Sequence, residues 1–392
     1  MPLAMKKVGI GVIGCGGISA EHLKSYALFP EICEIVAVSD SILERAEVRK
    51  REFNVPSAYQ NYIELLKDDR VDAVSICTPH NLHAPIAVEA AEARKHVLVE
   101  KPMAISFDKA KEMIGAAKRS GVKLSVIFQN RFSPDNKFMK EKVTPHWGRP
   151  IFGYVTTFHF RDSAYYASGP WRGKWTGEGG GVFINQAIHA WDIMQWLMGG
   201  KVIRAEGYWT NILHPSIEVE DIGYGLADLK NGSRLKVLTT SCCSGPDAGV
   251  IRFENGTYRG FGEELTDGDF ELTDKSLQED LKAQLNLRRS EKKSDNHTKQ
   301  ILDFVQAIRE DREQGVTGES AAETLKIVDG LHEHGREFEG AFKRWILRNY
   351  VLPSKIEDAK DKDLEHTGGL GQLIKDMIEI AKSERPLETP FA

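Results

Sequence analysis

The sequence predicts an α/β protein in two units, a parallel sheet covered by helices on both faces followed by an α+β unit with an antiparallel sheet. The first observation is an alternation of short apolar runs and helical segments over the first 130 residues. The second is a change after residue 150 to longer strand-like segments that contain Asn-Gly turns. A length of 392 residues suits two domains better than one.

The first part of the chain alternates between two kinds of segment. Apolar runs predict strands at 7–14, 34–40, 71–79, 96–102 and 123–131, and the segments between them predict helices at 19–29, 42–53, 82–94 and 107–119. Because such continuous apolar strands have no polar face, helices must cover both sides of the sheet. This arrangement is typical of a parallel sheet.

The second part contains longer strand-like segments, at 151–162, 201–212, 222–242 and 249–261. Asn231-Gly232 and Asn255-Gly256 each predict a hairpin turn, because both residue types adopt the positive φ angles of such turns. Helices are expected at 296–310 and 319–338. We predict a division into residues 1–130, 131–340 and a charged C-terminal extension, 341–392, with a helix at 371–382.

Composition argues against several classes of function. The net charge of −5, with both signs mixed along the chain, argues against a nucleic-acid or membrane-surface partner. No run of 18 apolar residues occurs, and the N-terminus lacks the apolar region of a signal peptide. The five cysteines are scattered without a C-x-x-C pair, so we expect no metal site and a reducing, cytoplasmic compartment.

A glycine-rich turn, in the segment GVIGCGGIS, follows the first predicted strand. Gly14, Gly16 and Gly17 would let a pyrophosphate approach the backbone at the start of the next helix. Ser19 stands where the third glycine of a G-x-G-x-x-G motif is usual. An ordinary tight turn between strand and helix is the alternative explanation.

Asp40 ends the second predicted strand. A carboxylate at this place accepts a hydrogen bond from the 2′-hydroxyl of an adenosine ribose and would repel the 2′-phosphate of NADP. The sequence therefore favours NAD. The alternative is that Asp40 caps the helix predicted at 42–53.

Glu100 and Lys101 end the strand predicted at 96–102, at the edge where parallel sheets bind ligands. A lysine that emerges from an apolar strand is partly desolvated, which lowers its pKa and directs a cation into the crevice. A surface lysine in an ordinary loop is the alternative.

Polar residues interrupt the helix predicted at 184–198, which is otherwise apolar and therefore expected to be buried. Asn185, His189 and Asp192 form one stripe on this helix, just after three glycines at 179–181. Buried polar groups need partners, so these side chains either satisfy one another and the backbone or face a ligand.

Five segments in this order resemble the glucose–fructose oxidoreductase / myo-inositol dehydrogenase family (Gfo/Idh/MocA): the three glycines of residues 14–17, TPHNLH (78–83), VEKP (99–102), QNRFSP (129–134) and EGGGVFINQAIHAWD (178–192). The resemblance covers about residues 6–340. It implies an N-terminal Rossmann domain, NAD as the cofactor, and a C-terminal α+β domain on a large, mainly antiparallel open sheet.

The resemblance also implies roles for individual residues. Lys101 and His189 form the catalytic pair, in which the imidazole takes the hydroxyl proton and the ammonium stabilises the developing alkoxide. Asn185 positions the substrate. The implied cofactor-binding residues are Gly14, Gly16, Gly17, Ile18, Asp40, Thr78, Asn81, His83, Glu100, Lys101 and Gln129. The substrate wall is expected to include Arg161, Tyr165, Trp171 and Arg172, for which core packing or a subunit contact is the alternative.

Position 185 departs from the family pattern, which often has Asp there. Asn185 removes a charge that would raise the pKa of His189. Asn followed by Gln186 is similar to the sugar-nucleotide and glycoside 3-dehydrogenases of the family, which implies oxidation at C3.

Three functions fit this sequence. The first is NAD-dependent hydride transfer between a secondary hydroxyl of a sugar, polyol or glycoside and nicotinamide. The second uses NAD transiently, so that oxidation and elimination cleave a glycosidic bond before re-reduction. The third is a non-catalytic sugar or NAD sensor, which would not need Lys101 and His189. The expected partners are a small carbohydrate and further copies of the chain, in a dimer or tetramer formed through the open sheet.

Overall fold

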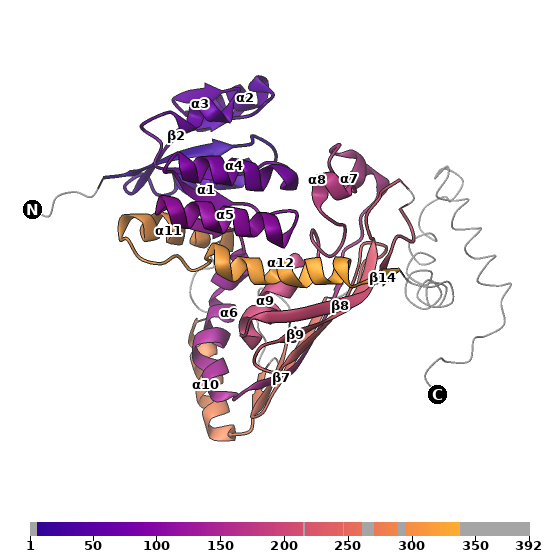
Figure 1. Cartoon of the computed structure of the whole chain (residues 1–392). Helices are drawn as coiled ribbons and strands as arrows, with labels where there is room; N and C mark the ends of the chain where they lie inside the picture. Colours follow the sequence, from indigo (N-terminus) through magenta and orange to yellow (C-terminus); the bar gives the residue numbers. More distant parts are fainter. Residues whose placement is uncertain (1–5, 215, 246, 261–269, 289–294, 338–392) are drawn as a thin grey trace, which may run out of the picture.

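The structure, a computed structural model, describes residues 6–214, 216–245, 247–260, 270–288 and 295–337 (Figure 1). Within these residues the chain forms two sheets, of six and eight strands. The extension at 341–392, with its predicted helix at 371–382, lies outside the described residues. The division of the chain at residues 130 and 340 therefore stays our proposal.

The first sheet is parallel and has the strand order β3-β2-β1-β4-β5-β6. Its strands are β1 (Val8–Ile13), β2 (Cys33–Ser39), β3 (Ser57–Tyr59), β4 (Ala73–Ile76), β5 (His96–Val99) and β6 (Leu124–Val126). Its helices are α1 (Ser19–Ala27), α2 (Leu43–Phe53), α3 (Tyr62–Leu66), α4 (His80–Glu92) and α5 (Phe107–Ser120).

Every residue of β1 and β4 is buried, which confirms the parallel sheet predicted from apolar runs. The strand order reverses between these two strands, so their carboxyl ends open into the crevice where such sheets bind ligands. The short elements β3 and α3 were not predicted from the sequence.

The second sheet is mostly antiparallel, with the order β13-β12-β11-β7-β10-β9-β8-β14. Its strands are β7 (Pro150–Phe158), β8 (Val202–Thr210), β9 (Ile222–Leu229), β10 (Arg234–Thr240), β11 (Ala248–Phe253), β12 (Gly256–Arg259), β13 (Phe270–Leu272) and β14 (Arg336–Glu337). Both predicted hairpins, β9–β10 and β11–β12, are present. The pairs β7–β10 and β8–β14 are parallel, so the sheet is mixed.

The remaining helical elements connect or cover the two sheets. They are η1 (Gln129–Phe132), α6 (Pro134–Phe138), η2 (Met139–Val143), η3 (Thr144–His146), α7 (Ser163–Ala167), α8 (Trp175–Glu178), α9 (Ile188–Met198), α10 (Lys275–Arg288), α11 (Asn296–Arg309) and α12 (Gly318–Glu333). Helix α12 runs along β8 between the two sheets, which fixes one sheet against the other (Figure 1).

Helix α9 begins at Ile188, so the prediction of a helix over 184–198 was wrong at its start. The preceding residues form an irregular turn because the carboxylate of Glu220, just before β9, accepts from the backbone N–H groups of Gly181 at 2.9 Å and Phe183 at 3.0 Å. A Cβ at Gly181 would lie 1.8 Å from the Glu220 carbonyl oxygen, so only glycine fits. Asn185 therefore lies in this turn, outside the helix.

Helix α11 returns from the C-terminal part of the chain to the first sheet. Its side chains Ile301, Phe304 and Val305 share one core cluster with Val8 and Ile10 of β1. The hydroxyls of Thr298 and Ser25 lie 2.9 Å apart, which joins α11 to α1.

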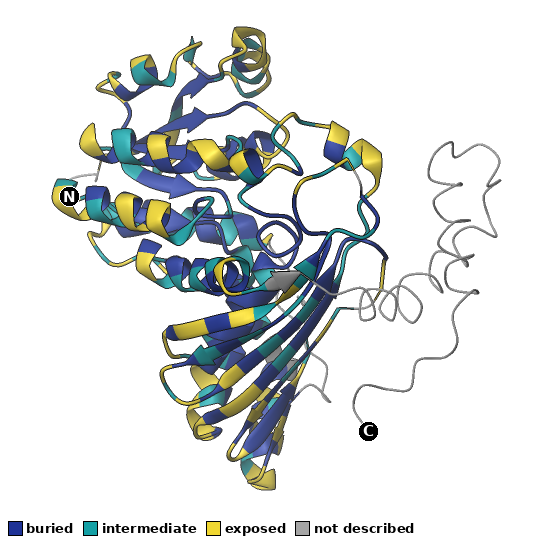
Figure 2. Cartoon of the chain, turned by 45° about the vertical axis from the view of Figure 1, so that its right-hand side comes forward, coloured by how far each residue is buried: buried dark blue, intermediate teal, exposed yellow. Residues whose placement is uncertain are grey.

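Among the described residues, helices cover one face of the second sheet and leave the other uncovered. Along β9 and β10, buried residues alternate with less buried ones (Figure 2). The buried side packs against α9 and α12. On the opposite side, Lys236 Nζ lies 5.7 Å and 5.1 Å from the rings of Tyr154 and Tyr224. The second unit thus presents a wide open face of mixed apolar and charged side chains.

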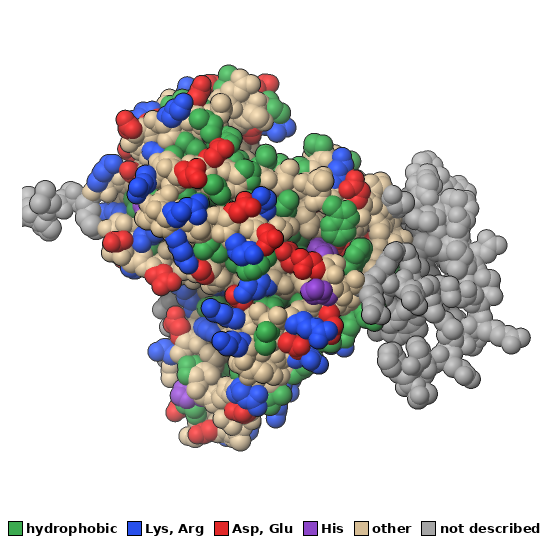
Figure 3. Space-filling model, in the orientation of Figure 1, with side chains coloured by type: hydrophobic (Ala, Val, Ile, Leu, Met, Phe, Trp, Pro, Cys, Tyr) green, Lys and Arg blue, Asp and Glu red, His purple; other side chains and the backbone are tan. Residues whose placement is uncertain are grey.

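Acidic and basic side chains are interspersed over the face of the molecule shown in Figure 3. Among the described helices, none has both the length and the apolar character needed to cross a bilayer. All five cysteines are buried and free.

Candidate active site

Lys101 lies where the two sheets meet. It follows β5, and its ammonium Nζ donates to the backbone oxygen of Asn185 at 3.0 Å and to Asn185 Oδ1 at 3.2 Å. Burial lowers the pKa of Lys101, while the carboxylates of Glu100 and Glu178 oppose this effect and Arg172 adds to it. The structure thus brings two members of the predicted catalytic set, Lys101 and Asn185, into contact.

Glu178 is the partner of Asn185 that the sequence did not reveal. The carboxylate is buried at the end of α8, where Oε1 accepts from Asn185 Nδ2 and Oε2 accepts from Gly173 N at 2.5 Å. Burial raises the pKa of Glu178, although these two donors and Arg172 oppose the rise. The amide of Asn185 therefore bridges a cation and a carboxylate.

His189 lies in the first turn of α9. Its Nδ1 is buried and has no hydrogen-bond partner among the described residues. Burial, and then the charge of Lys101, lowers the pKa of His189 to about 3. The imidazole is consequently uncharged at neutral pH and can accept a proton.

Asp192 does not belong to this group, although the sequence placed it on the same stripe. Its carboxylate pairs with Arg131, with distances of 2.8 Å to Nε and 2.6 Å to Nη2, and accepts from the Thr324 hydroxyl at 3.2 Å. Asp192 and Arg131 are 1% and 3% exposed. The predicted stripe therefore divides into a site histidine and a structural ion pair.

The glycine-rich turn has the properties expected of a pyrophosphate site. Gly14 has a φ of +91°, and a Cβ there would lie 2.7 Å from the Cys77 backbone. At Gly16 and Gly17 a Cβ would meet no atom within 4 Å, so the turn faces open space. The next predicted cofactor residue, Ile18, is 41% exposed.

Asp40 lies beside this turn and holds it in place. Its Oδ2 accepts from Cys15 N at 2.8 Å and its Oδ1 from Ile42 N at 2.9 Å. The N-cap of α2 is Ile42, which receives no side-chain cap, so Asp40 is not the cap of this helix although it accepts from the N–H of Ile42. Ribose binding by Asp40 stays a prediction.

The predicted cofactor residues beyond Asp40 fall into two groups. Thr78 Oγ1 and Gln129 Oε1 are buried atoms without partners among the described residues, as is His189 Nδ1. Buried polar atoms of this kind need a partner. Three of them, together with the open glycine turn, fit a polar ligand such as NAD. Asn81, in the first turn of α4, is exposed.

The other two predicted cofactor residues have protein partners. The ring nitrogens of His83 lie 2.8 Å from Pro102 O and 2.9 Å from Thr78 O, so His83 fixes the loops after β4 and β5. Glu100 Oε1 lies 2.9 Å from His22 Nε2 and 3.4 Å from His297 Nε2. Burial raises the pKa of Glu100, but these histidines outweigh it and hold the pKa below its usual range.

The predicted substrate wall gathers around the Tyr165 hydroxyl. Arg172 Nη1 donates to it at 2.6 Å, Asn185 Nδ2 at 2.9 Å and Gln186 Nε2 at 3.3 Å. Trp171 lies beside Arg172, whose Cζ is 4.4 Å from the indole. Tyr165 therefore contacts Asn185 directly, Arg161 and Arg172 contact Tyr165, and Trp171 is joined to this group through Arg172.

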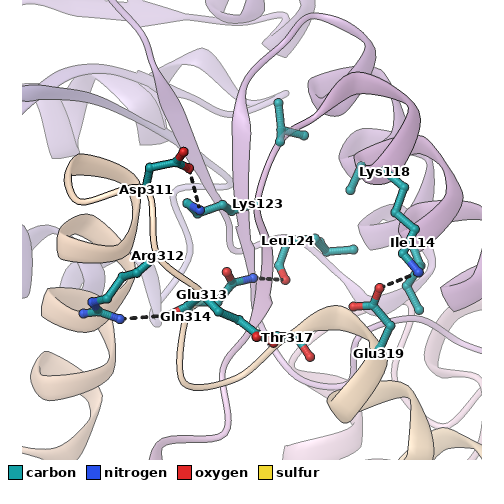
Figure 4. A pocket seen from close by; sticks show the side chains of 12 residues that line it. Ile114, Lys118, Lys123, Leu124, Asp311, Arg312, Glu313, Gln314, Thr317 and Glu319 are labelled. Carbon is teal, nitrogen blue, oxygen red and sulfur yellow. Dashed lines mark hydrogen bonds and ion pairs between the residues drawn. The ribbon is translucent and has the colours of Figure 1, made fainter.

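A cavity of about 300 Å³ lies elsewhere, between α5, β6 and the α11–α12 connection (Figure 4). Lys118 and Lys123 at its edge pair with Glu319 at 2.7 Å and Asp311 at 3.4 Å. None of the predicted site residues lines it, so this cavity is separate from the candidate active site.

The comparison with known proteins agrees with this geometry. Residues 8–128 match the oxidoreductase family with an NAD-binding Rossmann fold, and residues 147–259 match the GFO/IDH/MocA C-terminal domain. The chain belongs to the Gfo/Idh/MocA family. As a member of this family it is an NAD-binding oxidoreductase of the sugar and polyol dehydrogenase type.

Individual Gfo/Idh/MocA relatives resemble the chain to different extents. It is 28% identical to the oxidoreductase YrbE of Bacillus subtilis over 334 residues, which span 82% of this chain and 93% of that protein. It is 30% identical to scyllo-inositol 2-dehydrogenase (NAD(+)) of Bacillus subtilis, but this alignment spans only 54% of this chain and 60% of the relative. The WlbA dehydrogenase from Bordetella pertussis, in complex with NADH and UDP-GlcNAcA, has a TM-score of 0.73 and 26% identity, covering 85% of this chain and 96% of that one.

Proposed function

We propose that the chain is an NAD-dependent dehydrogenase that transfers hydride between a secondary hydroxyl of a sugar, polyol or glycoside and nicotinamide. The observation that carries the proposal is the contact of Lys101 with Asn185, together with a neutral His189 and with buried atoms of Thr78 and Gln129 that have no partner among the described residues. A base, a cation and a positioning amide are what removal of a hydroxyl proton requires.

In this proposal each protein group has one task. NAD, when bound, supplies the acceptor for the hydride. The imidazole of His189 takes the hydroxyl proton, since its lowered pKa keeps it neutral. The Lys101 ammonium stabilises the negative charge that develops on the substrate oxygen, and Asn185 keeps that ammonium in position. Asp40 selects NAD by opposing a 2′-phosphate.

The proposal also includes the position oxidised, the oligomeric state and the compartment. Oxidation at C3 is supported by Gln186 following Asn185 and by a 30% identical relative, D-glucoside 3-dehydrogenase of Escherichia coli, of which the alignment spans 55%. The open face of the second sheet supports a homodimer or homotetramer. The five free cysteines support a reducing, cytoplasmic compartment.

A substrate panel with NAD tests the proposed function. Purified full-length protein is incubated with hexoses, inositols, glycosides, uronates and sugar nucleotides, and NADH formation is followed by absorbance. Net NADH formation with at least one sugar or polyol is expected. Glycoside cleavage without net NADH would favour the elimination mechanism instead, and binding of NAD and sugar without any turnover would favour a sensor.

A further inference from the structure

Two arginines of the substrate wall have no acidic partner. Arg161 Cζ lies 4.9 Å and Arg172 Cζ 4.3 Å from the centre of the Tyr165 ring. Within the described part of the chain neither guanidinium forms an ion pair, although Arg172 donates to the Tyr165 hydroxyl and Arg161 Nη1 to Phe160 O at 3.0 Å. The Nε of Arg161 is buried without a partner.

Three acidic side chains on the neighbouring segments already have other partners. Asp162 caps α7 by accepting from Tyr165 N at 2.8 Å. Asp247 Oδ2 lies 2.8 Å from His159 Nε2. Glu178 is held by Asn185 and by the backbone of Gly173. None of these three carboxylates forms an ion pair with either guanidinium in the described structure.

The substrate wall therefore carries more positive than negative charge. Burial lowers the pKa of Lys101, and the charges of Arg172 and Arg161 lower it further. The site therefore contains three cations that act on one another. Among the carboxylates that act on Lys101, Glu178 lies on the substrate side, whereas Glu100 faces His22 and His297. A half-buried guanidinium is stabilised by an anion, and its planar fork suits a carboxylate or a phosphate.

We propose that the sugar oxidised here carries an anionic group, a carboxylate or a phosphate, which Arg161 and Arg172 bind beside Tyr165. This inference rests on the proposed function and adds the substrate class. The anion has two sources to distinguish, the carboxylate of a hexuronate and the phosphate of a sugar phosphate or sugar nucleotide. In either case a neutral sugar leaves both guanidinium groups without a direct ion pair among the described residues.

The inference is tested with neutral and anionic substrates that share the same kind of sugar ring, so that they differ in the anionic group. We compare glucose with glucuronate, glucose 6-phosphate and UDP-glucose in the NAD-dependent reaction of the full chain. At least one anionic sugar should exceed glucose in kcat/KM by about tenfold or more, and the compound that does so identifies the source of the anion. A kcat/KM for glucose equal to or above all three anionic compounds would overturn the inference and leave the proposed function intact.

Arginine variants test whether the two guanidinium groups cause the preference. Arg161→Met and Arg172→Met should each lower the ratio of anionic to neutral kcat/KM by about tenfold. The matched control is Arg149→Met, because Arg149 pairs with Glu254 on the surface at 3.2 Å and should leave the ratio unchanged. Variants that reduce both substrates equally would contradict the proposed role.

A binding measurement separates failure of this inference from failure of the proposed function. If no sugar in either class reduces NAD, calorimetry on the complex with NADH still compares the same four compounds. An anionic sugar that binds about tenfold more tightly than glucose, with the difference lost in Arg172→Met, would support the anion site without a dehydrogenase reaction. Equal affinities would overturn it.

Discussion

Exchanging the amide and the carboxylate of the Asn185–Glu178 contact tests whether these side chains act as one unit. Asn185 Nδ2 donates to Glu178 Oε1, and the Lys101 ammonium lies 3.2 Å from Asn185 Oδ1. The change Asn185→Asp turns this contact into two facing carboxylates in a buried site. Two like charges about 3 Å apart repel by roughly 5 kcal/mol at an effective dielectric constant of about 20, equivalent to roughly 4 pKa units.

Lys101 and Arg172 offset part of this repulsion, so we expect one carboxyl of the pair to keep its proton at neutral pH. A carboxyl whose pKa is raised by folding destabilises the protein as the pH rises above its unfolded pKa. Relative to the unaltered protein, Asn185→Asp should lose up to about 1.4 kcal/mol of unfolding free energy per pH unit between about pH 4 and the raised pKa. Urea titrations at a series of pH values measure this loss.

The matched control is the double variant Asn185→Asp/Glu178→Gln, which keeps one amide and one carboxylate and exchanges their places. The unfolding free energy of the double variant should depend on pH as that of the unaltered protein does. Its kcat/KM for sugar oxidation should exceed that of Asn185→Asp at least tenfold, a difference of about 1.4 kcal/mol in transition-state free energy. The reasoning is refuted if Asn185→Asp unfolds with the pH dependence of the unaltered protein, or if the effects of the two single changes simply add.

Other expectations concern the cofactor, the catalytic pair and the core. NADH should bind at least tenfold, or about 1.4 kcal/mol, more tightly than NADPH. Asp40→Ser should reduce this difference in Kd. Equal Kd values for NADH and NADPH in a fluorescence titration of the unaltered protein would contradict the expectation. Lys101→Ala should lower kcat about a hundredfold or more with NADH binding retained, and activity within a few-fold would exclude a catalytic role. Because the pKa of His189 is about 3, kcat/KM for oxidation should show no acidic limb from this imidazole above about pH 5, and a near-normal rate of His189→Gln would contradict its role as base. Asp192→Ala should lower the unfolding free energy by about 3–5 kcal/mol, since it leaves Arg131 buried without its partner, and a loss below about 1 kcal/mol in urea would refute this.

The elements that the sequence predicted are those with strong local signals. Continuous apolar runs identified the strands of the first sheet, and two Asn-Gly pairs identified the hairpins β9–β10 and β11–β12. The elements that it missed depend on other parts of the chain. The strand β3 has only three residues, all half-buried, and forms by pairing with β2. The late start of α9 is imposed by Glu220, which lies 32 residues after α9 begins at Ile188.

The candidate site follows the same rule. Lys101, Asn185 and His189 could be chosen because each interrupts an apolar segment or matches a motif. Glu178 gave no such signal, because a single acid before three glycines is ordinary in a loop. The burial of Glu178 against Asn185 depends on the tertiary structure, as does the pairing of Asp192 with Arg131, 61 residues away.

The return of α11 to the first sheet has a consequence for biosynthesis. The ribosome makes β1 roughly 280 residues before α11, whose side chains Phe304 and Val305 complete the core around Val8 and Ile10. At about 5–20 residues per second, this interval lasts on the order of tens of seconds. Until residue 309 has left the exit tunnel, the part of the β1 core that α11 covers therefore stays exposed to solvent.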